Sequence, residues 1–312
     1  MQNYHDLLQR ILDEGEEIDT ERTGVGTIAI FGEVLKFDMS KGFPAITTKK
    51  LAWKSVVSEL LWFLRGSSNV HELRAILHGE ENRFNLEKKT IWDENYENQA
   101  KSLGYTNGEM GDIYGAQWRN FGRGEFYHMD SNGFGENHDV KGVDQIKEVL
   151  KEAAKNTSSR RLIVNAWNPR VIWDTDYDDN FEAKKAALPP CHYGFQLNIV
   201  NGRLDMLWVQ RSVDSLLGLP FNIASYALLQ HIFAQILGLK VGTLNGHLGN
   251  VHLYKNHIDQ VKEQLSREHF PAPKLWINPD LKTLKDFENA SVDDFKLIGY
   301  ECHSAIKAPM AV

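Results

Sequence analysis

Cysteine is scarce in this chain, since only Cys191 and Cys302 occur among its 312 residues. Two cysteines cannot build the disulfide framework of a small secreted domain. The start, "MQNYHDLLQRILDEGEEID", lacks a basic segment followed by an apolar run, so it does not resemble a secretory signal. Together these absences predict a cytoplasmic protein with reduced thiols, in a host cytoplasm if the source is viral.

Positive charge is also in short supply, because 35 Lys and Arg stand against 42 Asp and Glu, for a formal net charge of -7. This balance argues against a general nucleic-acid or membrane-surface binder, and no DNA partner is expected. The most apolar stretch, "FNIASYALLQHIFAQILGLK", is interrupted by polar residues and predicts a buried helix, not a membrane span. A local site for a small anion remains compatible with the charge.

Helical and strand patterns alternate along the chain. The segment "KLAWKSVVSELLWFLRGSSNVHELRAIL" predicts two helices with a break at residues 66–68. "YGFQLNIVNGRLDMLWVQRS" predicts a hairpin that turns at Asn201-Gly202. Residues 119–142 are polar and rich in glycine, which predicts a long exposed loop. Without a repeat or a linker, this order predicts an α+β fold with one sheet, as a single domain over residues 1–312.

Cys191 is the clearest candidate for chemistry, in the segment "LPPCHYGFQ". Two prolines precede the cysteine and a strand follows it, so the thiol can face a cavity. A buried inert thiol is the ordinary role of a free cysteine, and no second cysteine nearby supports a zinc site. A nucleophile is the third interpretation. Arg211 in "QRSVD" would favour the reactive thiolate if the strand register brings it close, but an arginine in a surface ion pair remains open.

Several other residues have both a functional and a structural interpretation. Arg160 and Arg161 are adjacent in "SSRRL", which suits a phosphate group or a solvated charge pair. Glu59 is the only charge in "SVVSELLWFL", so it lies at a solvent edge or is buried with a raised pKa, as a proton donor. His252 and Tyr254 share one face of a strand, where they could hold a hydroxyl group or be half-buried structural residues.

Histidine and aromatic residues give weaker signals. His247, His252 and His257 recur every five residues, a spacing that fits one face of neither a helix nor a strand, so a metal site is not expected. Trp92 and Tyr114 offer flat surfaces that suit a planar heterocycle, although such residues are commonly part of a core.

Taken together, nine segments resemble the thymidylate synthase family. They are "ERTGVGT", "GFPAITTKK", "IWDEN", "YGAQWR", "SSRRLIVNAWNP", "ALPPCHYGFQ", "QRSVDSLLGLPFNIASYALL", "GNVHLYKNH" and the final "IKAPMAV". They occur in the family's order from about residue 3 to the last valine. The resemblance leaves out two insert-like loops, about residues 123–140 and 171–186. "LAWK" and "NYENQAK" resemble the enzymes of large bacterial viruses.

The resemblance implies a fold, a reaction and partners. The fold is α+β, with one large mixed sheet covered by helices, and the sheets pack in a homodimer. The reaction is the reductive methylation of dUMP to dTMP, in which methylenetetrahydrofolate is consumed as the donor of the carbon and the hydride; no metal is implied. Cys191 corresponds to the nucleophile that adds to carbon 6 of uracil, which lets carbon 5 attack the one-carbon unit.

The resemblance also assigns roles to individual residues. A phosphate site is implied for Arg22, Arg160, Arg161, Arg211 and Ser212, with Arg160 and Arg161 reaching in from the partner subunit. The rest of the nucleotide is implied to contact His192, Gln210, Asp214, Gly218, Asn222, His252 and Tyr254. Catalysis is implied for Cys191, Glu59, Tyr114, Arg211, Asn222 and Asp214. The folate site is implied to comprise Lys49, Ile91, Trp92, Leu188, Asp214, Leu217, Gly218, Phe221 and Val312, whose terminal segment would close as a lid.

Other functions compete with this one. A dUMP hydroxymethylase would use the same nucleotide and thiolate, but water would capture the methylene intermediate. Asn95 and Gly194, which stand where the family commonly has aromatic residues, leave this alternative open, whereas Trp92 and the C-terminal segment favour methylation. A non-catalytic RNA-binding relative is disfavoured by the acidic charge. A flavin-dependent enzyme is disfavoured because no phosphate-binding glycine loop precedes a helix.

Overall fold

One large mixed sheet organises the molecule. The computed structural model describes residues 1–19, 24–129, 135–173 and 181–309. The six strands lie in the order β1-β2-β9-β8-β7-β5. Their bounds are β1 (Glu16–Ile18), β2 (Thr27–Asp38), β5 (Ile163–Asn165), β7 (His192–Val200), β8 (Arg203–Asp214) and β9 (Lys240–Tyr254). Neighbouring strands are antiparallel except β8 and β9, which are parallel. The predicted α+β class with one mixed sheet is confirmed.

The predicted hairpin is formed by β7 and β8. Its turn residues, Asn201 and Gly202, have φ angles of 49° and 72°. Positive φ at both central positions is the requirement of a type I′ turn, which explains why this asparagine and glycine stand there. His192 pairs with Gln210, and the Arg211 N–H donates to the Cys191 carbonyl at 2.8 Å. The hairpin therefore brings Arg211 beside Cys191, as the register argument required.

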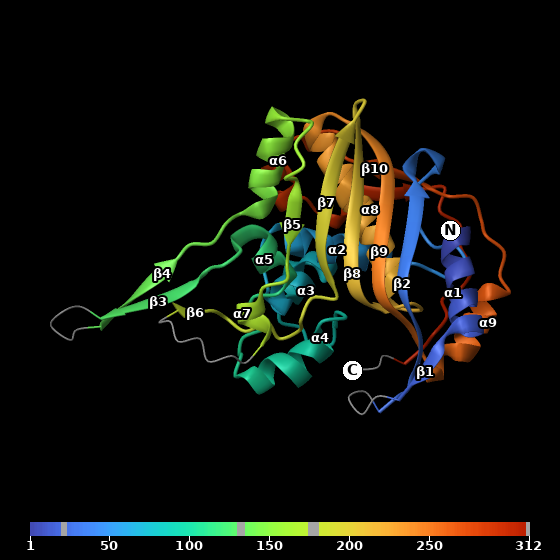
Figure 1. Cartoon of the computed structure of the whole chain (residues 1–312), viewed down its shortest axis with the longest axis horizontal. Helices are drawn as coiled ribbons and strands as arrows, with labels where there is room; N and C mark the ends of the chain where they lie inside the picture. Colours follow the sequence, from blue (N-terminus) through green and yellow to red (C-terminus); the bar gives the residue numbers. More distant parts are fainter. Residues whose placement is uncertain (20–23, 130–134, 174–180, 310–312) are drawn as a thin grey trace.

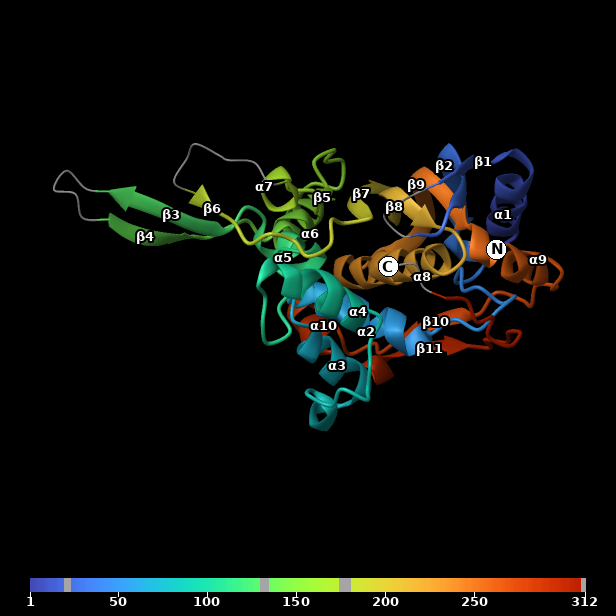
Figure 2. The same ribbon diagram turned by 90° about the horizontal axis from the view of Figure 1, so that it is seen from below.

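Helices cover one face of the sheet (Figure 2). The central one is α8 (Gly218–Leu237), which is apolar over most of its circumference and ends at Gly238 with a left-handed φ of 64°. It packs against β8 and β9 on one side and against α2 (Trp53–Leu64) on the other. Trp62, Trp208 and Tyr226 are almost completely buried in this layer. A helix that is apolar nearly all round belongs in such an interior position.

The remaining elements surround this core. They are α1 (Gln2–Glu14), α3 (Val70–His78), α4 (Asp93–Asn95), α5 (Tyr114–Asn120), α6 (Gln145–Lys155), α7 (Pro169–Ile172), α9 (Ile258–Leu265), α10 (Leu284–Asn289), β10 (Lys274–Ile277) and β11 (Phe295–Ile298). The break predicted at residues 66–68 separates α2 from α3. Across the described ranges, no helix has both the length and the apolar character that a membrane crossing needs.

A second, three-stranded sheet projects sideways from the body, beyond β5 (Figure 1). It contains β3 (Gly124–Met129), β4 (Gly135–Val140) and β6 (Phe181–Glu182), in the order β4-β3-β6. The sequence predicted a loop here, and that prediction was wrong for the secondary structure. Composition describes side chains, whereas these strands are held by backbone pairing such as Glu125 with Asp139. That the segment is an insertion stays a prediction.

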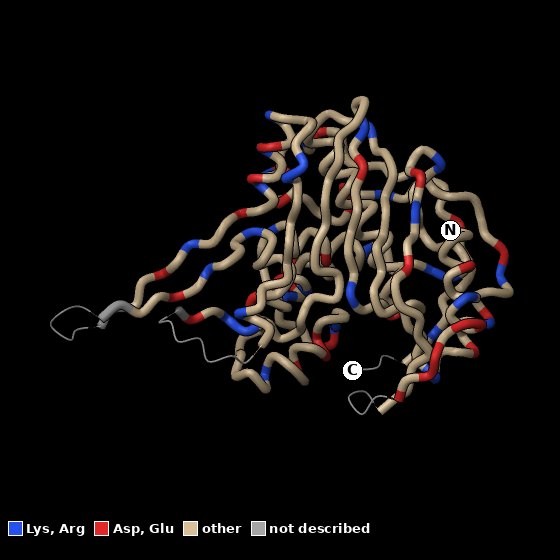
Figure 3. The backbone as a smooth tube through the Cα atoms, in the orientation of Figure 1, with Lys and Arg blue, Asp and Glu red and all other residues tan. Residues whose placement is uncertain are grey.

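The other face of the main sheet carries no helix in the part of the chain that the structure describes (Figure 2). Strand pairing aligns Gly194, Val209, His247 and Val34 in one row across it. Val34 is 60% exposed, and on the edge strand Ile163 is 52% exposed. Few charged residues lie along these strands (Figure 3). These exposed apolar side chains lie among polar ones such as the exposed His247, so the face is mixed in character.

Candidate active site

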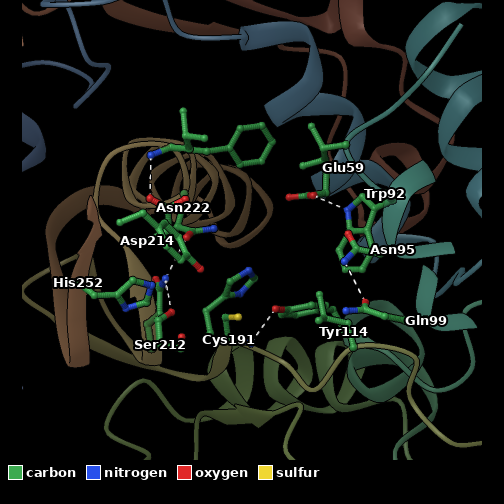
Figure 4. Close-up of a pocket in the computed structure, with 18 residues that line it drawn as sticks. Glu59, Trp92, Asn95, Gln99, Tyr114, Cys191, Ser212, Asp214, Asn222 and His252 are labelled. Atoms are coloured by element: carbon green, nitrogen blue, oxygen red, sulfur yellow. Dashed lines mark hydrogen bonds between the residues drawn. The ribbon is translucent and has the colours of Figure 1, made fainter. Parts of the chain in front are cut away.

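A cavity of about 350 Å³ lies where the carboxyl ends of β8 and β9 meet the start of α8 (Figure 4). Because these strands are parallel, Asp214 at the end of β8 pairs with His252 near the end of β9. The lining residues are Glu59, Ile91, Trp92, Asn95, Gln99, Tyr114, Leu188, Cys191, His192, Gln210, Ser212, Asp214, Leu217, Gly218, Phe221, Asn222, His252 and Tyr254. The volume lies in the range of a small-molecule site.

Cys191 stands directly before β7, with its sulfur at the cavity (Figure 4). Its N–H donates to the Tyr114 hydroxyl oxygen at 2.7 Å. Because that oxygen accepts the bond, the Tyr114 hydroxyl hydrogen can still be donated to a ligand. Burial raises the pKa of Tyr114 well above its usual value, with a further contribution from Cys191, so its hydroxyl stays protonated at neutral pH.

Arg211 contacts the cysteine segment from outside the cavity. Its Nε and Nη2 atoms donate to the carbonyls of Pro190 and Pro189, each at 3.0 Å. Its guanidinium also lies 5.2 Å from the ring centre of Trp167. The side chain is exposed and does not line the cavity. The positive charge thus lies next to the residue that precedes Cys191.

Glu59 is buried on α2 and points into the cavity (Figure 4). The structure thereby selects the buried interpretation of this lone charge. Burial raises the pKa of Glu59 to about 7, against an opposing effect of the hydrogen bond from the Trp92 indole, whose Nε1 donates to Oε1 at 2.6 Å. A carboxyl group with this pKa can both donate and accept a proton near neutral pH.

An amide pair forms the opposite wall. Gln210 on β8 donates from Nε2 to the Asn222 Oδ1 at 3.0 Å and to the Ser212 carbonyl at 3.1 Å. Trp208 in turn donates from Nε1 to the Gln210 Oε1 at 3.3 Å. These bonds orient Asn222, near the start of α8, so that its amide nitrogen remains available as a donor.

His252 and Tyr254 project from the end of β9, as their spacing predicted. Their rings meet edge to face, with centroids 5.3 Å apart, and both line the cavity. The His252 Nδ1 lies 2.8 Å from the Asn250 Oδ1, so Nδ1 carries the hydrogen when Asn250 accepts. The ring then offers Nε2 as an acceptor while it is neutral.

Asp214 connects the end of β8 to α8. Its Oδ1 accepts from the Leu216 and Leu217 N–H groups at 3.1 and 3.0 Å, a local turn that leads into the helix. Lys49 is buried behind this turn and donates to the Leu216 carbonyl. Burial lowers the pKa of Lys49 to about 8, although nearby Asp214 acts in the opposite direction.

Most of the residues expected at a site are brought together here, and four of the described ones are not. Arg211 and Lys49 lie outside the cavity lining, and Arg160 and Arg161 are exposed on the segment between α6 and β5. Arg22 and Val312 fall outside the described residues. His192 lines the cavity and contacts the Tyr226 hydroxyl through Nδ1 at 2.9 Å. Burial lowers the pKa of His192 to about 3, so its ring is neutral.

Two lining residues were not predicted. Asn95 donates from Nδ2 to the Gln99 Oε1 at 2.9 Å, and both side chains face the cavity near Trp92 (Figure 4). Their spacing of four residues was the available signal, because residues four apart share a helix face. Among the described residues, no three His, Cys, Asp or Glu side chains are grouped as a metal site.

Comparisons with known proteins agree over the full length. The family model described as thymidylate synthase matches residues 2–312. The chain is 47% identical over 321 residues to the thymidylate synthase of Enterobacteria phage T4, and 46% identical over 314 residues to a probable thymidylate synthase of Escherichia phage T5, with 100% of each chain covered. The crystal structure of the T4 phage enzyme matches with a TM-score of 0.83, at 47% identity and 100% coverage of both chains.

Proposed function

The chain belongs to the thymidylate synthase family. We propose that the family's reaction takes place in its cavity, with Cys191 as the nucleophile. The enzyme is a methyltransferase that converts dUMP to dTMP with a reduced folate as cosubstrate. The observation that supports this site is the position of Cys191, on the cavity wall and hydrogen-bonded to Tyr114. Both phage relatives carry the name of the methylating enzyme, which favours methylation over hydroxymethylation.

Cys191 supplies the nucleophile. Its thiolate forms a bond to carbon 6 of the uracil ring, and the ring electrons move toward carbon 5 and the neighbouring carbonyl oxygen. Carbon 5 then attacks the one-carbon unit of the folate. The proton on carbon 5 leaves and the bond between the one-carbon unit and the folate nitrogen breaks, which leaves an exocyclic methylene on the ring. A hydride from the tetrahydrofolate then adds to this methylene and expels the thiolate, so that dTMP and dihydrofolate are formed. Covalent catalysis divides a difficult substitution into easier steps. The adjacent charge of Arg211 would favour the thiolate, and Tyr114 is proposed to help remove the proton from carbon 5.

The polar walls suit the nucleotide. Asn222, held by Gln210, offers hydrogen bonds to the uracil edge, and His252 with Tyr254 offers them to the sugar hydroxyl. Ser212, His192 and Gly218 complete this side. The phosphate would be bound by Arg211 and Arg22 of the same subunit and by the arginine pair of the partner. Glu59, on the opposite wall, would exchange protons with the ring carbonyl through water.

The apolar walls suit the fused ring of the folate. Ile91, Trp92, Leu188, Leu217 and Phe221 line one side of the cavity, beside the Asp214 carboxylate. Apolar walls with a few polar groups are typical of sites for flat heterocycles. The folate would donate both its methylene carbon and a hydride. Lys49 is proposed to steer the glutamate tail and Val312 to close the terminal segment over the site.

The products decide between the two reactions. We expect the pure protein, given dUMP and methylenetetrahydrofolate, to form dihydrofolate and dTMP in equal amounts. Dihydrofolate is followed by its absorbance and dTMP by chromatography. Hydroxymethyl-dUMP accompanied by tetrahydrofolate would instead show that water captures the methylene group, and would overturn the methylation proposal.

The enzyme is further proposed to be a homodimer that packs through the helix-free sheet face. The exposed apolar side chains of Val34 and Ile163 support this surface. Arg160 and Arg161, exposed beside the same sheet, would reach the partner's phosphate site. Such an interface is self-complementary, with a twofold axis. No DNA partner and no metal are proposed.

Mixed dimers test the shared site. A Cys191→Ser chain and an Arg160→Ala/Arg161→Ala chain should each be inactive alone. Unfolded and refolded together in equal amounts, they should recover about a quarter of the wild-type activity, because one site in four then combines an intact cysteine with the partner's intact arginines. Steady-state assay of the mixture measures this. No recovery, in a mixture shown to contain heterodimers, would refute a site shared between subunits.

A further inference from the structure

Arg74 is an arginine with no contact to the cavity, yet it is almost fully buried on α3, at 1% exposure. Its Nη1 donates to the Arg83 carbonyl at 3.0 Å, and its Nη2 is paired with the Asp93 Oδ1. The guanidinium therefore joins the two ends of the segment from Arg83 to Asp93. Burying a charge is costly, and well-packed apolar residues can replace such pairs without loss of stability. A role beyond stability is a reasonable explanation for this arginine.

Asp93 is connected to the neighbouring Trp92 through hydrogen bonds with Thr90. Its Oδ2 accepts from the Thr90 N–H at 2.5 Å and from the Thr90 hydroxyl at 2.9 Å. The Trp92 N–H donates to the same hydroxyl oxygen at 3.2 Å. The indole of Trp92 then donates to Glu59 at 2.6 Å. A continuous series of polar contacts thus runs from Arg74 to the buried carboxyl group.

The rest of this segment is largely exposed. Phe84 and Leu86 are each 71% exposed, and residues 87–89 are exposed as well. On its inner side, the Trp92 ring packs edge to face with Trp62 at 5.3 Å and with Tyr114 at 5.9 Å. Those ring contacts fix how deeply the Trp92 ring is inserted into the core. The direction of its indole N–H also depends on the backbone of residues 90–93. That backbone is tied to the core through Arg74.

We propose that Arg74 is a positioning residue of the active site, which holds the Trp92 indole against Glu59 by way of Asp93. The proposal rests on the proposed function, in which Glu59 exchanges protons with the substrate. Arg74 touches neither substrate nor reacting atoms; it acts by fixing the orientation of the group that contacts Glu59. Misplacement of a catalytic group by about 1 Å can cost about 100-fold in rate.

Loss of the hydrogen bond from Trp92 also changes the pKa of Glu59 in a defined direction. The indole N–H stabilises the carboxylate, so without it the pKa of Glu59 rises. Three titratable side chains near Glu59 keep one form around pH 7. Burial holds the pKa of Tyr114 and Tyr226 far above neutrality and that of His192 at about 3. Cys191 also lies in the cavity, so the titration is followed at the indole itself.

A double-mutant cycle with Arg74→Met and Trp92→Phe tests the pathway. We expect Arg74→Met alone to lower kcat by about 10- to 100-fold, with a much smaller change in the KM for dUMP. In the Trp92→Phe background the same change should lower kcat by less than about threefold, because the group it positions is gone. Equal losses in the two backgrounds would overturn the proposal. If Arg74→Met does not fold, Arg74→Lys takes its place, since lysine keeps the charge but cannot hold both partners.

A measurement without turnover separates this proposal from the proposed function. In protein labelled with 5-fluorotryptophan, the Trp92 fluorine signal is identified by its loss in Trp92→Phe. We expect it to shift with pH around 7 as Glu59 titrates, and the midpoint to move to higher pH, or the shift to vanish, in Arg74→Met. Arg83→Met is the control, because it removes a partly exposed guanidinium paired with Glu80 and keeps the Arg83 carbonyl. An unchanged midpoint in Arg74→Met would refute the proposal even in an enzyme with another substrate.

Discussion

Replacing Cys191 with serine is expected to lower kcat for dTMP formation by about 10⁴-fold or more. A hydroxyl group is far less acidic than a thiol, so it cannot supply the anion that adds to the uracil ring. Loss of a nucleophile commonly removes most of an enzyme's rate enhancement. The fold should be unaffected, because serine is smaller and the site is half-buried.

The second cysteine provides the matched control. Cys302 is also half-buried, but it lies far along the chain in the segment after β11 and does not line the cavity. Cys302→Ser should therefore keep nearly all activity. Mass spectrometry of a complex trapped with a fluorinated uracil nucleotide and the folate should find the adduct on Cys191. A Cys191→Ser enzyme with a rate near that of the wild type, or an unmodified Cys191 in the trapped complex, would eliminate the covalent mechanism.

Replacing Glu59 with glutamine is expected to have opposite effects on activity and on stability. An amide cannot exchange a proton with the ring carbonyl, so kcat should fall by about 10²- to 10⁴-fold. The side chain keeps its shape and can still accept the hydrogen bond from the Trp92 indole. Single-turnover measurements with saturating dUMP would report the change in the chemical steps.

The stability effect follows from the raised pKa of Glu59, about 7 in the folded protein against 4.5 as its usual value. Between these values the folded state holds a proton that the unfolded state has lost, so the free energy of unfolding falls as pH rises. The effect is absent below pH 4.5 and complete above pH 7, where it reaches about 3 kcal/mol. Relative to the wild type, Glu59→Gln should therefore be more stable at pH 8 than it is at pH 5.

Urea unfolding of the wild type and the variant at the two pH values measures this difference. Glu97→Gln is a suitable control, because Glu97 and Lys101 form an exposed surface pair, which contributes little to stability. If Glu59→Gln showed the same pH dependence of unfolding as the wild type, Glu59 would not be a buried proton carrier. Separately, an active Glu59→Gln variant would show that Glu59 is not a catalytic residue.

The sequence was informative where a residue contrasts with its neighbours. Cys191 was conspicuous because cysteine is rare, and Glu59 because it is the only charge in the apolar stretch "SVVSELLWFL". Asn201-Gly202 predicted its turn because positive φ restricts the choice of residue. These signals are local, so they can be recognised without the fold. The resemblance to a family then connected them, since no local pattern relates a cysteine at position 191 to a carboxylate at 59.

Other features depended on contacts between distant segments. Arg74 belongs to an ordinary amphipathic helix, and only its burial against Asp93 distinguishes it. Lys49 looks like a surface lysine in "TTKK", yet its amine turns inward to the Leu216 carbonyl. The hairpin of β3 and β4 is polar and rich in glycine, so its side chains gave no strand signal. In each case the deciding interaction is made by backbone groups or by partners far away in sequence.

Because α8 links β8 to β9, its length sets the relative positions of the active-site residues at its two ends. Asn222 lies near the start of this helix, and the chain that leaves its far end returns as the strand carrying His252 and Tyr254. Inserting or deleting one residue near the start would turn Asn222 by about 100° away from Gln210. A length change after Gly238 would instead shift β9 beneath an unmoved helix. Indels at either end would thus spoil different halves of nucleotide recognition, so the length of this crossover is as constrained as the identity of the side chains it carries.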